Sequence, residues 1–585
     1  MPVKMRTVTG GGAVLDLISP RASHRMWERF WEDADLGHGG VFSSTVLESF
    51  SFASAQYVPG GTTLVLSIPA SCEPDQTLSM ITIVDVDTER TLDDFAAHAS
   101  LKRPVEDLRA VAQQYAGRLE DRTVWMVNST AQGGGVAEML PKVVSILREL
   151  GVSTEWAVIV SEEERFFQLT KHIHNLLHGS GDPHLSDDDR ALYRSVSEKM
   201  AEGLARRMDP GDPVVAHDPQ PLGTGALLKE KMNVPAIWRC HIGLDESNAA
   251  TETAWNFLRP WAETYDETIF SLREYVPDFL ADRSDLIQPA INPLSPKNRV
   301  LSTTELTDIL RRAQLAGSPH PTVDRDFATP AQRLQRDGSF APATRPQDLG
   351  LLERPIVAQI SRWDRLKGFA PLLQGFARMK ETRFLDRNAV SERDRYRLSL
   401  TRLVLAGPDP DSVSDDPEGQ KVFNEICSLW HDLPPEIQQD IAIITLPMTS
   451  RRVNALMVNA LQRCSTVVAQ NSLREGFGLT VTEAMWKRRP VMGTTAAGLR
   501  EQVKDGVHGR CNLQAEDPKS VARTLHEMLN AEGERKRWAR NARSRVSERY
   551  LVFTQVRRWL EILAQAVDRQ EAVAVDGRSK EEDSV

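Results

Sequence analysis

The sequence predicts two doubly wound α/β domains, each built around a parallel sheet, preceded by a small β-rich module. Short apolar runs alternate with amphipathic helical stretches at 124–127, 157–160, 214–216 and 236–238. After a segment rich in Pro, Gly and polar residues, the alternation restarts at 356–360, 403–406, 441–446, 466–469 and 490–493. Strands that are apolar on both faces are typical of parallel sheets covered by helices on both sides. Each series of runs therefore predicts one domain.

Length and composition fit this organisation. The 585 residues are 41% hydrophobic and 26% charged, with a net charge of −10, which leaves room for more than one domain and argues against general nucleic-acid binding. No apolar run approaches the roughly 18–20 residues of a membrane helix, and the N-terminus lacks the apolar core of a signal peptide. Five scattered cysteines without a CxxC spacing indicate neither a disulfide framework nor a zinc site. We therefore expect a cytoplasmic protein without membrane contact.

Composition shifts place the domain boundaries. Residues 1–92 form the β-rich module, 93–330 the first α/β domain and 350–545 the second, joined by a polar linker. Residues 546–568 are expected to form a packed C-terminal helix, and the charged tail 569–585 to be disordered. Ligands of doubly wound sheets bind at the carboxyl ends of the strands, so we expect a cleft between the two domains.

The strongest functional motif is the segment REGFGLTVTEA at 474–484, between a strand and a helical stretch. Gly476 and Gly478 allow a sharp turn and a close backbone approach to a ligand. The helix that follows presents free N–H groups to an anion or a sugar oxygen. Glu475 and Glu483 can both face the cleft, where a carboxylate accepts hydrogen bonds from vicinal hydroxyls. The alternative, that Glu475 caps the turn and Glu483 is solvated, is less favoured because of the glycines and the strand–turn–helix context.

A second motif, RWDRLKGF, follows the apolar run at 356–360. Arg362 and Lys367 lie in a strand-to-helix loop, where an Arg fork and a Lys point charge suit a diphosphate or a departing phosphate. Alone, these residues could equally be solvated loop charges. Together with the glutamate motif they favour phosphate contact, while Arg365 is expected to be solvated.

A glycine triplet lies in the third motif, NSTAQGGGVAE, after the strand at 124–127. Gly134 and Gly135 can cradle a phosphate with backbone N–H groups. The motif is neither GxGxxG nor a P-loop, and a tight turn is its simpler explanation.

Two histidine-containing segments complete the candidate site. His174 and Asn175 lie in TKHIHNLLHG, and His217 and Asp218 end a strand facing the expected cleft. There a histidine can donate to a sugar oxygen and an aspartate can accept from hydroxyls. His241, in IWRCHIGLD, either lines the cleft or positions its loop. A buried histidine with satisfied hydrogen bonds is the ordinary alternative for each of the histidines.

Seven segments in one order resemble a known family. They are VNSTAQGGGVAEML, KHIHN, VVAHDPQPL, IWRCHIGLD, IQPAINPLSPKN, QISRWDRLKGF and SLREGFGLTVTEAMWKRRPV. From about 120 to 570 the chain resembles retaining GT-B glycosyltransferases, which have two Rossmann-like domains facing each other across a cleft. Within them it looks most like the trehalose synthases, which transfer glucose from a nucleotide sugar to free glucose.

The resemblance implies roles for individual residues. The spacing of Glu475 and Glu483 matches the E-x7-E pattern of that superfamily, in which the first glutamate binds the donor sugar and the second the ribose. Residues matching Arg362 and Lys367 hold the donor phosphates. The implied catalytic residues are Arg362, Lys367 and Glu475; the donor-binding residues are Gly134, Gly135, Gly476, Phe477, Gly478, Leu479 and Glu483; and the acceptor-binding residues are His174, Asn175, His217, Asp218 and His241.

The resemblance also implies a reaction, in which a nucleoside diphosphate glucose and glucose give α,α-trehalose with retention. No metal or further cofactor is expected, because cationic side chains neutralise the leaving group. The expected partners are small molecules, with a homodimer possible. Two alternatives stay open. One is a trehalose phosphorylase, which converts trehalose and phosphate to glucose 1-phosphate and glucose. The other is a non-catalytic sugar or nucleotide sensor that uses residues 1–92 as an interaction module.

Overall fold

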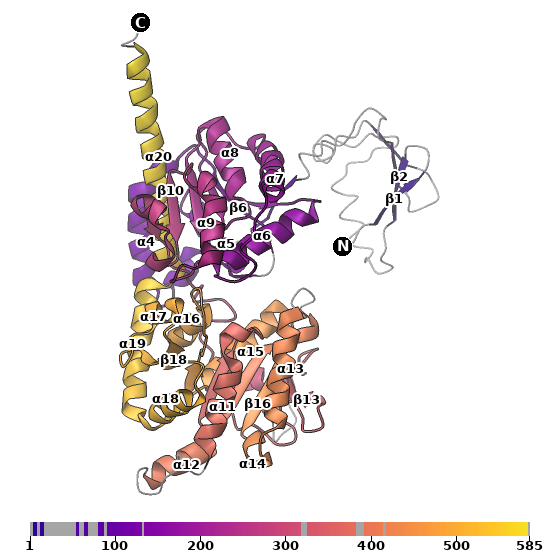
Figure 1. Ribbon diagram of the computed structural model, residues 1–585, viewed down its shortest axis with the longest axis vertical. Coiled ribbons are helices and arrows are strands. Elements are labelled where there is room, and N and C mark those ends of the chain that lie inside the picture. The colour runs from indigo at the N-terminus through magenta and orange to yellow at the C-terminus, as the bar shows by residue number, and fades with distance from the viewer. Residues whose placement is uncertain are drawn as a thin grey trace. The chain divides into compact units, whose positions relative to one another are not determined.

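The computed structural model describes residues 4–8, 12–16, 54–57, 64–67, 80–86, 90–131, 134–317, 325–381, 391–412 and 417–582 (Figure 1). The chain divides into two compact units, Met1–Ser79 and Met80–Val585. Among the residues described, no helix is both long enough and apolar enough to cross a membrane.

The first unit contains a four-stranded antiparallel sheet in the order β1-β2-β4-β3. Its strands are β1 (Lys4–Val8), β2 (Gly12–Asp16), β3 (Ser54–Tyr57) and β4 (Leu64–Ser67). The sheet agrees with the predicted β-rich module, but the predicted boundary at residue 92 does not match the division after Ser79. The next strand, β5 (Ile81–Ile83), pairs with β7 of the first α/β domain and so belongs to the second unit.

The first α/β domain of the second unit has a seven-stranded sheet in the order β11-β10-β9-β8-β6-β7-β5, parallel except for β5. Its strands are β6 (Val124–Asn128), β7 (Thr154–Ile159), β8 (Val214–His217), β9 (Ala236–Cys240), β10 (Glu267–Phe270) and β11 (Ser284–Leu286). Its helices are α3 (Leu92–Ala96), α4 (Lys102–Tyr115), α5 (Gly134–Glu149), α6 (Glu164–Leu177), α7 (Asp187–Ala205), α8 (Leu222–Met232) and α9 (Ala249–Ala262). β6, β8, β9 and β10 are buried along their whole length, because helices cover both faces.

The second α/β domain has an eight-stranded sheet in the order β13-β12-β16-β15-β14-β17-β18-β19. Its parallel strands are β14 (Ile356–Ile360), β15 (Arg402–Pro408), β16 (Ile441–Leu446), β17 (Val467–Ala469), β18 (Val491–Thr494) and β19 (Gly509–Asn512). The helices are α10 (Thr303–Arg312), α11 (Phe369–Lys380), α12 (Glu392–Leu400), α13 (Pro417–His431), α14 (Pro435–Gln438), α15 (Arg451–Cys464), α16 (Leu479–Trp486), α17 (Ala497–Gln502) and α18 (Pro518–Asn530).

The segment predicted as a linker carries structure of its own. β12 (Gln332–Leu334) and β13 (Phe340–Pro342) form a hairpin, and β12 adds to the sheet antiparallel to β16. The second domain therefore begins before residue 350. The hairpin strands are too short and too polar to stand out as apolar runs, which explains why the sequence analysis missed them.

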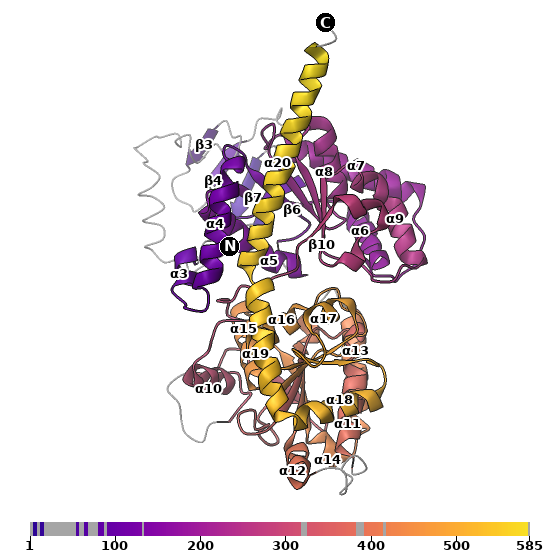
Figure 2. The same ribbon diagram turned by 90° about the vertical axis from the view of Figure 1, so that its left-hand side faces the viewer.

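Two long helices end the described chain. α19 (Glu532–Arg549) packs on α16 of the second domain, and α20 (Val552–Glu582) packs on α4 and α5 of the first, as Figure 2 shows for α4. Trp559, Leu560, Ile562 and Leu563 of α20 are buried, as expected of a packed helix. The prediction of a disordered tail from 569 is wrong for 569–582, which continue the helix. Asp568 and Glu571 pair with Arg118 and Arg122 and extend its attachment to the first domain.

The strand orders place the motifs. In the second sheet β14 lies between β15 and β17, so the chain moves away in one direction and returns on the other side. The loops after β14 and β17 therefore flank a topological switch point, where doubly wound sheets bind ligands. In the first sheet the loops after β6 and β8 flank the corresponding point.

Candidate active site

Lys367 and Glu475 meet at the switch point of the second sheet. The Lys367 ammonium donates to both Glu475 carboxylate oxygens, at 2.8 Å and 2.8 Å. The Ser472 hydroxyl and the Gln470 amide also donate to this carboxylate, at 2.9 and 3.3 Å. The carboxylate is thus held in one orientation by groups from two loops. A candidate phosphate-binding cation and a candidate sugar-binding carboxylate lie side by side, as a glycosyl phosphate requires.

The loop that carries Lys367 is fixed by its own polar contacts. Asp364 caps the short helical turn by accepting from the Leu366 N–H at 2.8 Å. The Gln359 amide donates to the Lys367 carbonyl at 2.7 Å and accepts from the Asn471 N–H at 2.9 Å. Gln359 therefore ties the two loops of the site together from inside the sheet.

Gly368 ends this turn with φ 64°, in the left-handed region. A Cβ at this position would lie 2.0 Å from the Asn471 carbonyl oxygen, a backbone atom that cannot move without shifting the neighbouring loop. Only glycine fits both the dihedral angle and the space.

Replacing Gly368 by alanine is therefore expected to destabilise the fold by about 3 kcal/mol or more, since strain and a backbone clash add. The measurement is the shift in thermal midpoint. Gly533→Ala in α19 is the control, because a Cβ there meets nothing within 4 Å, and we expect it to be neutral or stabilising. Equal stabilities for the two variants would contradict the close packing of Gly368.

The turn before α16 is built by close backbone packing. Gly478, with φ 85°, precedes Leu479, the first residue of α16. The N–H groups in the first turn of this helix have no partner within the helix. The Tyr275 hydroxyl, from the first domain, donates to the Gly476 carbonyl at 2.8 Å. Phe477 is buried against Tyr550, so its side chain belongs to the core and only its backbone lies in the turn.

Arg362 is exposed, and no described residue forms an ion pair or hydrogen bond with its side chain, so its guanidinium is available to a ligand. Its charge acts on His174, whose pKa falls to about 4 through burial first, then through the charges of His178, Arg362 and Lys171. The first domain thus brings α6 close to the phosphate-binding candidates. Asn175, next to His174, is exposed.

His178, which the sequence analysis did not select, lies at the same place. Its pKa is lowered by burial and then by the Lys367 ammonium, while Glu475 raises it. The Arg474 guanidinium donates to the His178 carbonyl at 3.3 Å and joins the two domains there. His174 and His178 are one helical turn apart with ring centroids at 4.9 Å. That spacing in the sequence was the signal that could have identified His178.

The glycine motif begins α5. Gly134 is the first residue of the helix, and a Cβ at Gly135 would meet nothing within 4 Å. Asn128 fixes the start of the loop by donating to the Thr130 carbonyl at 2.8 Å and accepting from the Trp156 indole at 2.8 Å. The open space at Gly135 leaves the helix N-terminus accessible.

His217, Asp218 and His241 form a separate cluster at the ends of β8 and β9. His217 Nδ1 and His241 Nε2 are 2.9 Å apart, and Asp218 accepts from the His241 N–H at 2.8 Å. His217 is only 2% exposed and packs against Trp559 of α20. Burial, and then the charge of Arg239, lower the pKa of His217 to about 3. Burial raises the pKa of the Asp218 carboxyl to about 6. Among the described residues no hydrogen bond or ion pair joins this cluster to Lys367 or Glu475, and its acceptor role stays a prediction.

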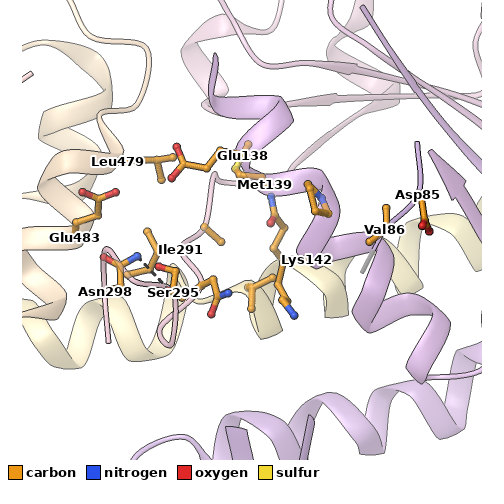
Figure 3. Close-up of a pocket in the computed structure, with 15 residues that line it drawn as sticks. Asp85, Val86, Glu138, Met139, Lys142, Ile291, Ser295, Asn298, Leu479 and Glu483 are labelled. Carbon is orange, nitrogen blue, oxygen red and sulfur yellow. Dashed lines mark hydrogen bonds between the residues drawn. The ribbon is translucent and has the colours of Figure 1, made fainter. Parts of the chain in front are cut away.

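Glu483 lines a pocket of about 330 Å³ between the two α/β domains (Figure 3). Figure 3 shows Glu483 and Leu479 of α16 on one side and Glu138 and Met139 of α5 on the other. The Glu483 carboxylate lies 3.7 Å from the Lys297 ammonium. Burial raises its pKa, against the influence of Lys297 and Lys487.

Comparison with known proteins identifies the family. The family models "Trehalose synthase, N-terminal domain" and "Glycosyl transferases group 1" match residues 126–277 and 343–545. Trehalose synthase of Thermococcus litoralis is 33% identical over 460 residues, covering 78% of this chain and 94% of that protein. The chain belongs to the trehalose synthase family. The trehalose synthase of Rubrobacter xylanophilus is 32% identical, covering 68% of this chain and 81% of that protein.

More distant relatives define the wider group. A trehalose phosphorylase of Grifola frondosa is 25% identical over 458 residues, covering 76% of this chain but 57% of that protein. The crystal structure of an α,α-trehalose 6-phosphate synthase from Burkholderia multivorans matches with a TM-score of 0.53 at 18% identity, covering 77% of this chain and 99% of that one. The predicted GT-B fold is thereby confirmed. This member of the trehalose synthase family is a glycosyltransferase, and its activity is trehalose-related.

Proposed function

We propose that this glycosyltransferase makes α,α-trehalose by transferring glucose, with retention, from a nucleoside diphosphate glucose to free glucose. The observation that carries the proposal is the contact between Lys367 and Glu475 at 2.8 Å. A donor placed there would put its β-phosphate on Lys367 and its glucose hydroxyls on Glu475, so the glycosidic C–O bond would lie between a cation and a sugar-binding carboxylate.

In the proposed reaction the bond between glucose C1 and the diphosphate oxygen breaks, and a bond between C1 and the acceptor O1 forms on the same face. The proton of the acceptor hydroxyl passes to an oxygen of the leaving diphosphate. Lys367, Arg362 and the N–H groups at Gly134 and Gly135 neutralise the charge that develops on that diphosphate. No side chain need attack C1 in this scheme, in contrast to a double displacement.

The proposed direction of synthesis is supported by the relatives. The trehalose synthase of Thermococcus litoralis is 33% identical and matched over 94% of its length, against 25% and 57% for the phosphorylase of Grifola frondosa.

Product analysis tests the proposal. The purified protein is incubated with glucose and each of several nucleoside diphosphate glucoses, and separately with trehalose and either a nucleoside diphosphate or phosphate. We expect trehalose in the first reactions and a nucleotide sugar from trehalose and nucleoside diphosphate. Glucose 1-phosphate formed only from trehalose and phosphate would show a phosphorylase instead, and ligand binding without any turnover would show a sensor.

A further inference from the structure

The loop that joins the two α/β domains is fixed to the second of them. The Asn459 amide donates to the carbonyl oxygens of Pro296 and Arg299, at 2.9 and 3.0 Å. The buried Lys487 ammonium donates to the Asn298 side chain at 3.1 Å. Lys297, which lies between these anchored residues, therefore keeps its backbone with the second domain.

The side chain of Lys297 nevertheless reaches both domains. Its ammonium donates to the Glu138 carboxylate of α5 at 2.7 Å and lies 3.7 Å from the Glu483 carboxylate of α16. One cation thus joins a carboxylate of the first domain to a carboxylate of the second, and both carboxylates line the pocket in Figure 3. The Lys297 side chain is 23% exposed and Glu483 8%, so solvent screens this contact only in part.

Burial raises the pKa of the Glu483 carboxyl, and nearby cations lower it. The groups that face it are Lys297 from the joining loop, Lys487 from its own helix and Glu138 from α5. Lys487 Nζ donates to Gln462 at 2.6 Å and to the Glu483 carbonyl at 3.2 Å, rather than to the carboxylate. Lys297 is thus the cation within ion-pair distance of the Glu483 carboxylate among the residues described. The Gln462 side chain also interacts with the Glu483 carboxylate. A carboxylate has about four acceptor positions, so acceptor sites for two hydroxyls are left.

We propose that Lys297 is a positioning residue for donor binding: its ammonium, shared by Glu138 and Glu483, keeps the Glu483 carboxylate ionised and directed into the pocket between the domains. This inference rests on the proposed function, in which Glu483 binds the donor ribose. The first domain takes part through Glu138. The approach of the two domains is therefore linked to the ionisation and orientation of the Glu483 carboxylate.

The test measures equilibrium binding of nucleoside diphosphates to the full chain by calorimetry, from about pH 6 to about pH 8. Without Lys297 the Glu483 carboxyl has a higher pKa, so it is protonated over more of this range and accepts fewer hydroxyl hydrogen bonds. Lys297→Met removes the ion pair with Glu483 and is therefore expected to raise the dissociation constant of the nucleoside diphosphate about tenfold. It is also expected to shift the pH midpoint of binding upward. Glu138→Gln removes a negative charge beside Glu483 and is expected to shift that midpoint downward.

Two controls separate positioning from folding. Lys297→Arg keeps the charge and is expected to restore most of the affinity and the wild-type pH profile. Arg299→Met removes a neighbouring cation that pairs instead with Glu305 at 2.7 Å, and is expected to bind as the wild type does. In steady-state assays Lys297→Met should raise the KM for the donor more than it lowers kcat.

The outcomes distinguish this inference from the proposed function. Wild-type protein that binds no nucleoside diphosphate and forms no trehalose overturns both. Wild-type binding with turnover, together with an unchanged affinity and pH profile in Lys297→Met, overturns the inference alone. Equal weakening at every pH, or midpoint shifts of the same sign in Lys297→Met and Glu138→Gln, would likewise reject it.

Discussion

Replacing Lys367 by alanine is expected to reduce turnover of donor and glucose roughly a hundredfold or more, which is about 3 kcal/mol of transition-state stabilisation. The ammonium is the group placed to neutralise the leaving diphosphate, and its loss also frees Glu475 from the contact at 2.8 Å that orients it. Both effects act on the same bond. Because charge develops on the diphosphate only as that bond breaks, kcat should fall more than donor affinity.

Steady-state kinetics of trehalose formation measure this effect, with circular dichroism to check the fold. Arg365→Ala is the matched control, since Arg365 lies on the same short turn but pairs with Glu425 at 3.0 Å and is exposed. We expect the control to retain nearly full turnover. A folded Lys367→Ala variant with turnover close to that of the wild type would remove Lys367 from the mechanism.

The local part of this site could be predicted from the sequence, because it depends on short-range features. Apolar runs marked β14 and β17, and the glycines and charges after them marked two strand-to-helix loops at the ligand-binding edge. The contact between Lys367 and Glu475 needs one further fact, that β14 and β17 are neighbours although β15 and β16 lie between them in the chain. Apolar periodicity identifies strands but does not order them.

Other features depend on contacts between distant segments and left little trace in the sequence. His217 and His241 look like two separate histidines, and only the pairing of β8 with β9 brings their rings together. Lys297 lies in a polar loop like many other lysines, yet it meets carboxylates 159 and 186 positions away. The prediction of a disordered tail was wrong because a charged segment by itself is typical of disorder. The ion pairs of this part of the chain with Arg118 and Arg122 of the first domain are not visible in the sequence.

Acid is expected to destabilise the first α/β domain through the pair formed by His217, which is buried, and His241, which is half-buried. In the folded protein the pKa of His217 is about 3, and that of His241 is well below its ordinary value because of burial and the Arg239 charge. In the unfolded chain both titrate near pH 6.5, so below that pH the unfolded state binds more protons. Their contribution to stability is therefore complete above about pH 6.5 and is lost as the pH falls toward about 3.

For His217 the expected size is about 1.4 kcal/mol per pH unit, or roughly 2 kcal/mol between pH 6.5 and pH 5, and His241 adds a loss of the same sign. Asp218, whose pKa burial raises to about 6, acts in the opposite direction below that pH, so the pair has to be isolated by mutation. The measurement is the free energy of unfolding by urea at about pH 7 and about pH 5, in the wild type and in a His217→Gln, His241→Gln double variant.

The double variant should lose stability at neutral pH but show a much smaller further loss on acidification. His184→Gln serves as the control, because His184 is exposed and its removal should leave the acid sensitivity unchanged. An identical loss on acidification in the wild type and the double variant would mean that the pair accepts protons in the folded state, which the 2.9 Å separation of His217 Nδ1 and His241 Nε2 opposes. Two protonated rings would both be donors at that contact and would repel each other, so the contact opposes protonation of both rings in the folded state.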